Sequence, residues 1–298
     1  MISFRHRALA STMLTGIAAV SPMTAAAADL SAKNPIFSPQ TYQPAVDGLN
    51  WKIAGLGGTM ADRAIYGGTG SVSIPLAGQY GLQLDVATGA YDDRYFAAGG
   101  AHLFWRDPSR GLVGLYGSAT HWDEFGGLRV GQVAGEVEFY FGQWTIQGIA
   151  GVETGNSKTA IVGNFTETYN TETRFFDKIN LAYYINDNWK SFVGHRYLGG
   201  KHALALGTEF AFRVNGPTMG SLFVEGRIGE DDYNGVWGGL RFYGGQKDKT
   251  LIQRHRQDDP IEWTPETLFS IVNGQSSTPV VKKKPPEAPP PPCVGDFC

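Results

Sequence analysis

Hydrophobic and polar side chains alternate along much of this chain with a period of two residues. The stretch from Gly127 to Glu153 shows the alternation most regularly. Its apolar positions are Val133, Val137, Phe139, Phe141, Trp144, Ile146 and Val152, and its polar positions are Gln132, Glu136, Glu138, Tyr140, Thr145, Gln147 and Glu153. This period is typical of β-strands with one apolar and one polar face. Because Gly142-Gln143 divides the stretch with a short turn, it predicts a β-hairpin.

The same pattern recurs from Trp51 to Tyr243 and predicts twelve strands, with ten as the alternative count. The predicted ranges are 51–58, 68–75, 80–90, 95–105, 111–122, 128–141, 144–154, 174–185, 189–198, 201–213, 220–230 and 235–243. Most runs reach about ten residues, which exceeds the usual ~5–6 of a strand and matches the length that a tilted strand needs to cross a bilayer. An even number of strands with short turns at one end predicts an all-β, antiparallel, up-and-down transmembrane barrel.

The connections between these strands fall into two sets. One set is short and rich in turn-forming residues, as at Gly142-Gln143 and at residues 186–188. The other set includes longer segments at 59–67 and 123–126, and above all Gly155 to Thr173. We expect the longest loop to be the outer functional element, because long barrel loops often serve as binding elements or lids. A mobile, passive loop is the alternative.

Parity alone does not say whether the apolar face is the core or the outside. An aqueous barrel or sandwich buries its apolar face, whereas a membrane barrel exposes that face to lipid. Aromatic residues near the short turns favour the membrane, since such residues collect at membrane–water interfaces. They are Trp105, Phe139, Phe141, Trp144, Tyr184, Trp189, Phe212, Phe242 and Tyr243. The soluble secreted alternative stays open at this point.

The segments on either side of the barrel differ from it in composition. Residues 1–28 have the basic start, the apolar run and the Ala25–Ala28 cluster of a secretory signal peptide. Residues 29–49 predict an irregular lead-in. Residues 245–274 are charged and contain one helix start, where Thr264 is the expected N-cap and Pro265 the first helical residue. Residues 275–298 predict a disordered, proline-rich tail.

The ends of the barrel and the two cysteines give expectations for this tail. Because twelve strands return the chain to the short-turn side, we expect residues 245–298 to be periplasmic. A cell-wall or periplasmic partner is one role for the tail, and a spacer without a partner is another. Cys293 and Cys298 stand far from the strands, and their spacing allows a small disulfide loop in an oxidising compartment.

Composition and motifs give little support for catalysis. The formal net charge of −3 does not suggest a nucleic-acid partner. No His-x-Ser occurs, and Ser191 and His195 stand ~13 Å apart on an extended strand, too far for a nucleophile–base pair. Acidic loop clusters at 92–93, 123–124 and 230–232 lack calcium-loop spacing. We predict neither an enzyme nor a metal or other cofactor.

Charged side chains share the polar parity of the strands and predict a paired network in the lumen. Six are acids and six are bases: Asp85, Glu136, Glu138, Glu153, Glu209, Glu225, Lys178, Lys190, Arg196, Arg213, Arg227 and Arg241. A buried charge is costly unless it is paired. Equal numbers of each sign let every charge find a partner, which would narrow a pore.

In these features the chain resembles the bacterial outer-membrane β-barrel proteins, the small porin-like class of Gram-negative bacteria. The resemblance covers the signal peptide and residues 50–244, and the closing strand Gly-Leu-Arg-Phe-Tyr at 239–243 is its most typical part. It implies a narrow conduit for small solutes in the outer membrane. A structural or envelope-interaction barrel is the alternative, and an outer-membrane hydrolase a distant one. Such barrels often end on an aromatic residue, whereas here a long segment follows Tyr243.

Overall fold

Long β-strands account for most of the structure. The computed structural model describes residues 42–280, apart from 215–217, 232 and 246–247. The signal peptide, most of the lead-in and the cysteine pair Cys293–Cys298 lie outside the described residues. The expectations for those segments therefore stay predictions.

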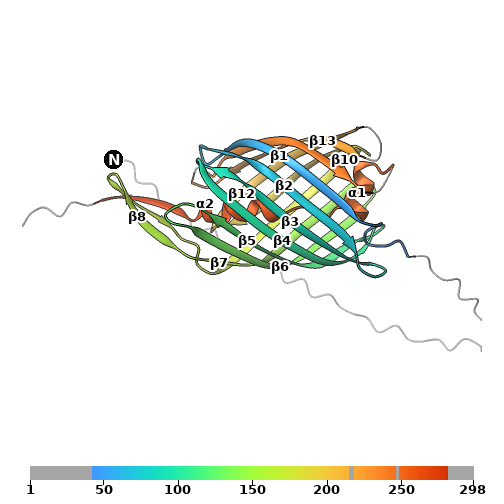
Figure 1. Ribbon diagram of the computed structural model, residues 1–298, viewed down its shortest axis with the longest axis horizontal. Coiled ribbons are helices and arrows are strands. Elements are labelled where there is room, and N and C mark those ends of the chain that lie inside the picture. Colours follow the sequence, from blue (N-terminus) through green and yellow to red (C-terminus); the bar gives the residue numbers. More distant parts are fainter. Residues whose placement is uncertain (1–41, 215–217, 232, 246–247, 281–298) are drawn as a thin grey trace, which may run out of the picture. The chain divides into compact units, whose positions relative to one another are not determined.

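Twelve antiparallel strands form a closed barrel, which confirms the predicted fold class and strand count (Figure 1). They are β1 (Asn50–Met60), β2 (Arg63–Pro75), β3 (Tyr80–Tyr91), β4 (Arg94–Asp107), β5 (Gly111–Trp122), β6 (Leu128–Phe141), β7 (Trp144–Gly155), β10 (Arg174–Asn186), β11 (Trp189–Leu198), β12 (Lys201–Arg213), β13 (Met219–Gly229) and β14 (Gly235–Gly244). Each neighbours the next along the chain, and β1 pairs with β14 from Trp51↔Gly244 to Met60↔Gly235. Closure leaves no unpaired strand edge, which a bilayer requires.

The two ends of the barrel differ in their connections. At the turn end, β1 begins and β14 ends. The connections at both ends have five residues or fewer, apart from the one between β7 and β10. At the hairpin end, a second hairpin made of β8 (Lys158–Val162) and β9 (Phe165–Tyr169) extends the β7–β10 connection. The expected long loop at 59–67 is wrong, because β1 and β2 continue to a two-residue turn.

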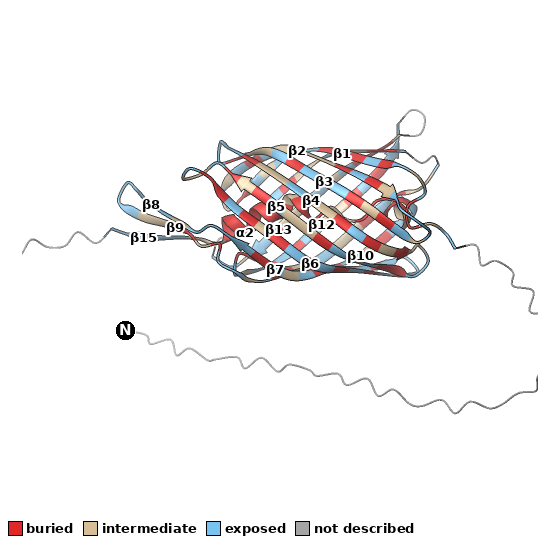
Figure 2. Cartoon of the chain, turned by 60° about the horizontal axis from the view of Figure 1, so that its bottom comes forward, coloured by how far each residue is buried: buried red, intermediate tan, exposed pale blue. Residues whose placement is uncertain are grey.

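Side-chain burial decides between the two possible arrangements of the faces. The apolar face is outside: Val133 and Leu115 are 72% and 66% exposed. The polar face is inside, where Gln132 and Glu136 are 1% and 3% exposed. An apolar band that surrounds a closed barrel is far larger than the patches found on soluble proteins. The soluble alternative is therefore excluded on physical grounds, and Figure 2 shows the alternation along the strands.

Two of the aromatic residues expected at the interface lie inside the barrel instead. Tyr184 and Tyr243 are each 1% exposed and hydrogen-bond to the ring of His255. Their parity is that of the inner wall, so closeness to a turn misled the prediction. Outward aromatic residues also occur near the hairpin end, where Tyr95 and Phe175 are exposed. The barrel thus has aromatic residues near both ends.

The chain after β14 adds helices and one more strand. They are α1 (Leu251–Gln257), the 3₁₀ helix η1 (Thr264–Glu266), α2 (Thr267–Asn273) and β15 (Gln275–Pro279). The predicted helix near 264–272 is present, although its first turn is 3₁₀. Helix α1 was not expected, and β15 occupies part of the tail expected to be disordered. Within the described part of the chain, neither helix has the length and apolarity to span a membrane.

The turn between β1 and β2 offers a test of the local backbone. Ala61 and Asp62 both have positive φ, at 49° and 59°, as in a hairpin turn that favours glycine. Because the left-handed region costs a non-glycine residue about 1–2 kcal/mol, Ala61→Gly should raise the free energy of unfolding by about 1 kcal/mol. Urea unfolding in lipid vesicles measures this.

Ala77→Gly is the matched control for that substitution. Ala77 is exposed in the turn after β2 and is not among the residues with positive φ. Glycine at position 77 would only increase the conformational entropy of the unfolded chain, so no gain in the free energy of unfolding is expected. If Ala61→Gly destabilised as much as Ala77→Gly, the left-handed turn would be contradicted.

Candidate functional site

The lumen of the barrel is occupied by the protein's own chain. Residues 248–274, here called the lumen segment, start at the turn end, where the amide of Ile252 donates to the carbonyl of Asp187 at 3.0 Å. They finish at the hairpin end, where the Asn273 side chain donates to the carbonyl of Leu198 at 2.8 Å. In Figure 1, α1 and α2 lie towards opposite ends of the barrel. The chain therefore passes through the barrel from one end to the other.

Glu266 in η1 joins the lumen segment to the barrel wall. Its carboxylate oxygen lies 3.0 Å from Arg196 Nε and 2.8 Å from Arg227 Nη2. Both arginines also reach Glu225, at 3.6 Å and 3.0 Å. The guanidinium of Arg227 lies over the ring of Phe269, 4.9 Å from its centroid. Charge-assisted contacts of this kind are among the stronger ones inside proteins.

His102 forms a second connection between the wall and the lumen segment. Its ring nitrogens lie 2.9 Å from Asp85 Oδ2 and 2.7 Å from Glu136 Oε2. The Thr264 hydroxyl donates to the same Asp85 oxygen at 3.1 Å. An imidazolium donates from both nitrogens and would reach one oxygen of each carboxylate. Gly100 lies next to Thr264, and a Cβ added to Gly100 would come within 2.1 Å of Thr264 Oγ1. The absence of a side chain at position 100 therefore leaves room for the lumen segment.

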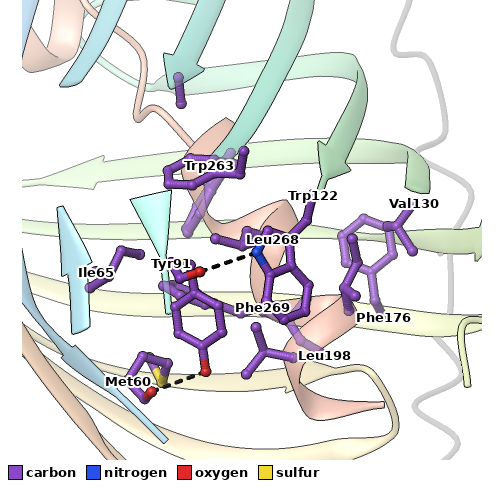
Figure 3. Close-up of a cluster of buried hydrophobic side chains, with 14 of the residues drawn as sticks. Met60, Ile65, Tyr91, Trp122, Val130, Phe176, Leu198, Trp263, Leu268 and Phe269 are labelled. Atoms are coloured by element: carbon purple, nitrogen blue, oxygen red, sulfur yellow. Dashed lines mark hydrogen bonds between the residues drawn. The ribbon is translucent and has the colours of Figure 1, made fainter. Parts of the chain in front are cut away.

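Apolar packing surrounds α2 near the hairpin end. Figure 3 shows Leu268 and Phe269 among wall side chains that include Tyr91 and Trp122. Leu268 and Trp122 are fully buried. Burying such side chains stabilises a fold by roughly 1.5–3 kcal/mol each. The lumen segment is therefore held by apolar contacts as well as by ion pairs.

The structure shows where each charge predicted for the lumen lies. On the inner wall, Asp85, Glu136, Glu138, Glu153, Lys178, Lys190, Arg196, Glu209 and Arg227 are buried, and Glu225 and Arg241 are half-buried. Arg213 is exposed at the end of β12 and pairs with Asp248, so its predicted lumen position is wrong. Lys52 and Arg106 were missed, although the parity of their strands places them inside.

The charged side chains of the inner wall pair with groups of the lumen segment as well as with charges on other strands. Glu209 lies 3.1 Å from Arg241 and 3.6 Å from Lys190. The ammonium of Lys178, by contrast, donates to the Trp263 carbonyl of the lumen segment at 3.1 Å. The wall charges thus pair with the lumen segment as well as with one another.

Small spaces remain on either side of the lumen segment. One cavity of about 90 Å³ is lined by Lys190, Arg241 and Glu262 among others. Another of about 90 Å³ lies near Ile65 and Phe269. Since a water molecule takes up about 30 Å³ in the liquid, each space holds a few waters.

Candidate catalytic and metal sites are weak among the described residues. There, no serine hydroxyl is hydrogen-bonded to a histidine: Ser191 bonds to Thr208, and His195 to Asp177 and His202. No group of His, Cys, Asp or Glu in the described ranges is arranged to hold a metal ion.

The acidic loop clusters, which lack calcium-loop spacing, contain side chains that pair with bases. Asp92 pairs with Arg63, and Glu124 lies 3.4 Å from Arg94. Partial burial raises the pKa of Glu124 even so. Asp231 likewise lies 3.8 Å from Lys201. These clusters serve local pairing at the hairpin end.

The expected position of the tail is wrong for its described part. The even strand count does return Gly244 to the turn end, but the lumen segment then crosses to the hairpin end. There β15 pairs with β9 in a three-stranded sheet of order β15-β9-β8. Helix α2 lies inside the barrel, near the hairpin end. Residues 281–298 lie outside the described residues.

Comparisons with known proteins find similar solved structures but no matching family. No protein-family model matches the chain, and no curated protein matches it. Similar solved structures include the KdgM porin in complex with disordered oligogalacturonate, at 8% identity and a TM-score of 0.46 over 65% of this chain and 99% of that one. The COG4313 outer membrane channel from Pseudomonas putida F1 has 10% identity and a TM-score of 0.47 over 69% and 98%. The translocator domain of autotransporter NalP from Neisseria meningitidis has 11% identity and 0.40 over 67% and 90%.

These TM-scores lie below 0.5, so the fold assignment depends on the chain's own features. Twelve long antiparallel strands, closure and an apolar exterior around a charged lumen are features of this chain itself. The chain folds as an outer-membrane-type β-barrel. What such a barrel does depends on its lumen, and here the lumen is filled.

Proposed function

We propose that this protein is a porin-like conduit for small solutes in the bacterial outer membrane, held closed by its own lumen segment. The observation that carries the proposal is a charged inner wall that contacts a separate, mostly polar stretch of chain. Glu266, Thr264 and Ser270 reach that wall through hydrogen bonds and ion pairs. A charged wall of this kind would line a water-filled channel once the segment leaves the lumen.

The exterior supports the membrane location in this proposal. Apolar side chains face outward around the barrel, and aromatic residues lie near its ends. Closed barrels and helices are the structures that satisfy all backbone hydrogen bonds in lipid. In bacterial barrels the short turns and the barrel termini face the periplasm. The β8–β9 hairpin would then face outward from the cell.

The size of the barrel supports a conduit. Eight strands leave an interior that side chains just fill, and diameter grows with strand number. Twelve strands enclose more space, which the lumen segment occupies here. With that segment removed, Lys190, Arg196 and Glu209 would border an aqueous bore. The bore would admit small polar solutes, and we propose no catalytic step.

A structural barrel without transport is the second candidate. The tight packing of α2 favours it, because Leu268 and Ile271 are completely buried. A segment held this firmly would stay in place. The two candidates predict different conductances when the segment is removed.

Planar-bilayer conductance separates these candidates. The full-length protein should conduct poorly, whereas a chain ending at Gly245 should show large unit steps because its bore is open. A chain ending at Val280 keeps the lumen segment and is the matched control, so it should stay closed. A closed barrel after truncation at Gly245, with its β-structure verified by circular dichroism, would contradict the conduit.

Arg227→Ala is a milder probe of the same closure. It removes the contacts with Glu225 and Glu266 but leaves every strand in place. Loosening this end of η1 should raise conductance above the wild-type level. Arg213→Ala is the control, since Arg213 is exposed at the rim, and it should leave conductance unchanged.

A further inference from the structure

The route of the C-terminal chain beyond the lumen carries a further inference. After Asn273 the chain joins the sheet outside the barrel, where β15 pairs with β9 from Gln275↔Tyr169 to Pro279↔Phe165. The amide of Val280 then donates to the carbonyl of Asn164 at 2.8 Å. Asn164 belongs to the turn between β8 and β9. The tail therefore follows the hairpin as far as its tip.

We propose that the barrel passes its own C-terminus through its lumen and presents it at the tip of the β8–β9 hairpin, on the side opposite its short turns. This display function does not depend on conduction. The five residues of β15 advance the chain by roughly 17 Å at ~3.3 Å per residue. The hairpin thus acts as a stalk that leads the tail away from the lumen.

The residues after Val280 have no route back to the turn end. The lumen is already occupied by residues 248–274. Passage through lipid would expose unpaired backbone groups to hydrocarbon. It would also carry Lys282, Lys283 and Lys284 across it. The last part of the chain therefore remains on the hairpin side.

Contacts near both ends of the described chain support this topology. The N-terminal part enters at the turn end, where the amide of Asp47 donates to Asp258 Oδ1 at 2.9 Å. The Arg254 side chain donates to the Gly244 carbonyl at 2.9 Å. The lumen segment is thus fixed where the barrel begins and ends, and it leaves at the other side. The two ends of the described chain thereby lie at opposite ends of the barrel.

A membrane-impermeant maleimide tests the proposal on reduced Gram-negative cells that carry the full-length protein. The reporter is Cys298 in a Cys293→Ser background. Two references use a chain with both native cysteines replaced: Asn164→Cys at the hairpin tip and Ser109→Cys in the exposed turn after β4. Each variant is labelled before and after the outer membrane is permeabilised.

We expect Cys298 to label like Asn164→Cys, fully in intact cells, whereas Ser109→Cys labels only after permeabilisation. Labelling of Cys298 that follows Ser109→Cys would overturn the proposal, whichever end of the barrel proves to be outside. Conductance does not enter this readout. A failed conduit and a failed display are therefore distinguishable.

A disulfide between β15 and β9 tests the path itself. Ser277 and Glu167 are directly paired across the two strands, so Ser277→Cys with Glu167→Cys should cross-link on mild oxidation. The matched control joins Ser277→Cys with Ser109→Cys at the other end and should not cross-link. Absence of the first cross-link in a folded barrel would overturn the stalk arrangement.

Discussion

Replacing Glu266 with alanine should destabilise the barrel by about 3–5 kcal/mol, the usual cost of removing one partner from a buried ion pair. The carboxylate contacts Arg196 and Arg227 at 3.0 Å and 2.8 Å. Both guanidinium groups are fully buried. After the substitution they would share Glu225 alone, so uncompensated charge would remain inside. Tryptophan fluorescence during urea unfolding in vesicles measures the loss.

Two further variants make that measurement specific. Glu266→Gln keeps the shape of the side chain and loses its charge, so its loss should be smaller than that of alanine. Glu172→Ala removes an exposed carboxylate from the loop after β9 and should change stability by less than about 0.5 kcal/mol. Equal unfolding midpoints for Glu266→Ala and Glu172→Ala would contradict a clamp at Glu266.

Arginine at position 133 should cost about 2–4 kcal/mol, as expected for a charge at mid-depth on a lipid-facing barrel wall. Val133 is 72% exposed near the middle of β6. In lipid its surroundings are hydrocarbon, whereas in water the same exposed position would accept arginine almost without cost. The stability of this variant therefore reports whether lipid or water surrounds the outer face of the barrel. Unfolding in vesicles gives the free energy.

Val162→Arg is the matched control for this prediction. Val162 is 44% exposed and belongs to the β8–β9 hairpin, beyond the twelve barrel strands. The same chemical change there should stay within about 0.5 kcal/mol of wild type. If Val133→Arg proved equally harmless in vesicles, the outward apolar band would not be in contact with lipid.

The sequence was sufficient to predict the barrel because its signals are local. Alternation along each strand separates inner Glu136 from outer Val133, and glycine or asparagine at the turns marks where each strand ends. The long connection predicted at 59–67 failed for a physical reason. Gly67, at the end of that predicted loop, lies in β2 and pairs with Gly89 of β3.

The filled lumen was not predictable in the same way. Helix α2 was predicted from its start, but it is buried on all sides, so no polar face indicates where it packs. Polar side chains of α2 such as Ser270 face a polar wall and not water, so a polar position in this helix does not indicate an exposed face. Counting strands placed the tail at the turn end, because a count cannot show that the chain turns back into the barrel. Glu262 and Glu266 could have indicated contact with the charged wall, because they are acids close to the start of an apolar helix.

The lumen segment also constrains how this protein is made. It follows β14 in the chain, yet it is enclosed by a wall whose last closing contact is the seam between β1 and β14. The close packing of α2 against the wall disfavours threading of a folded helix through a bore that has already closed. We therefore expect closure of the seam and passage of the C-terminus to be coupled during assembly. The final strand pairing thereby fixes the wall and its contents together.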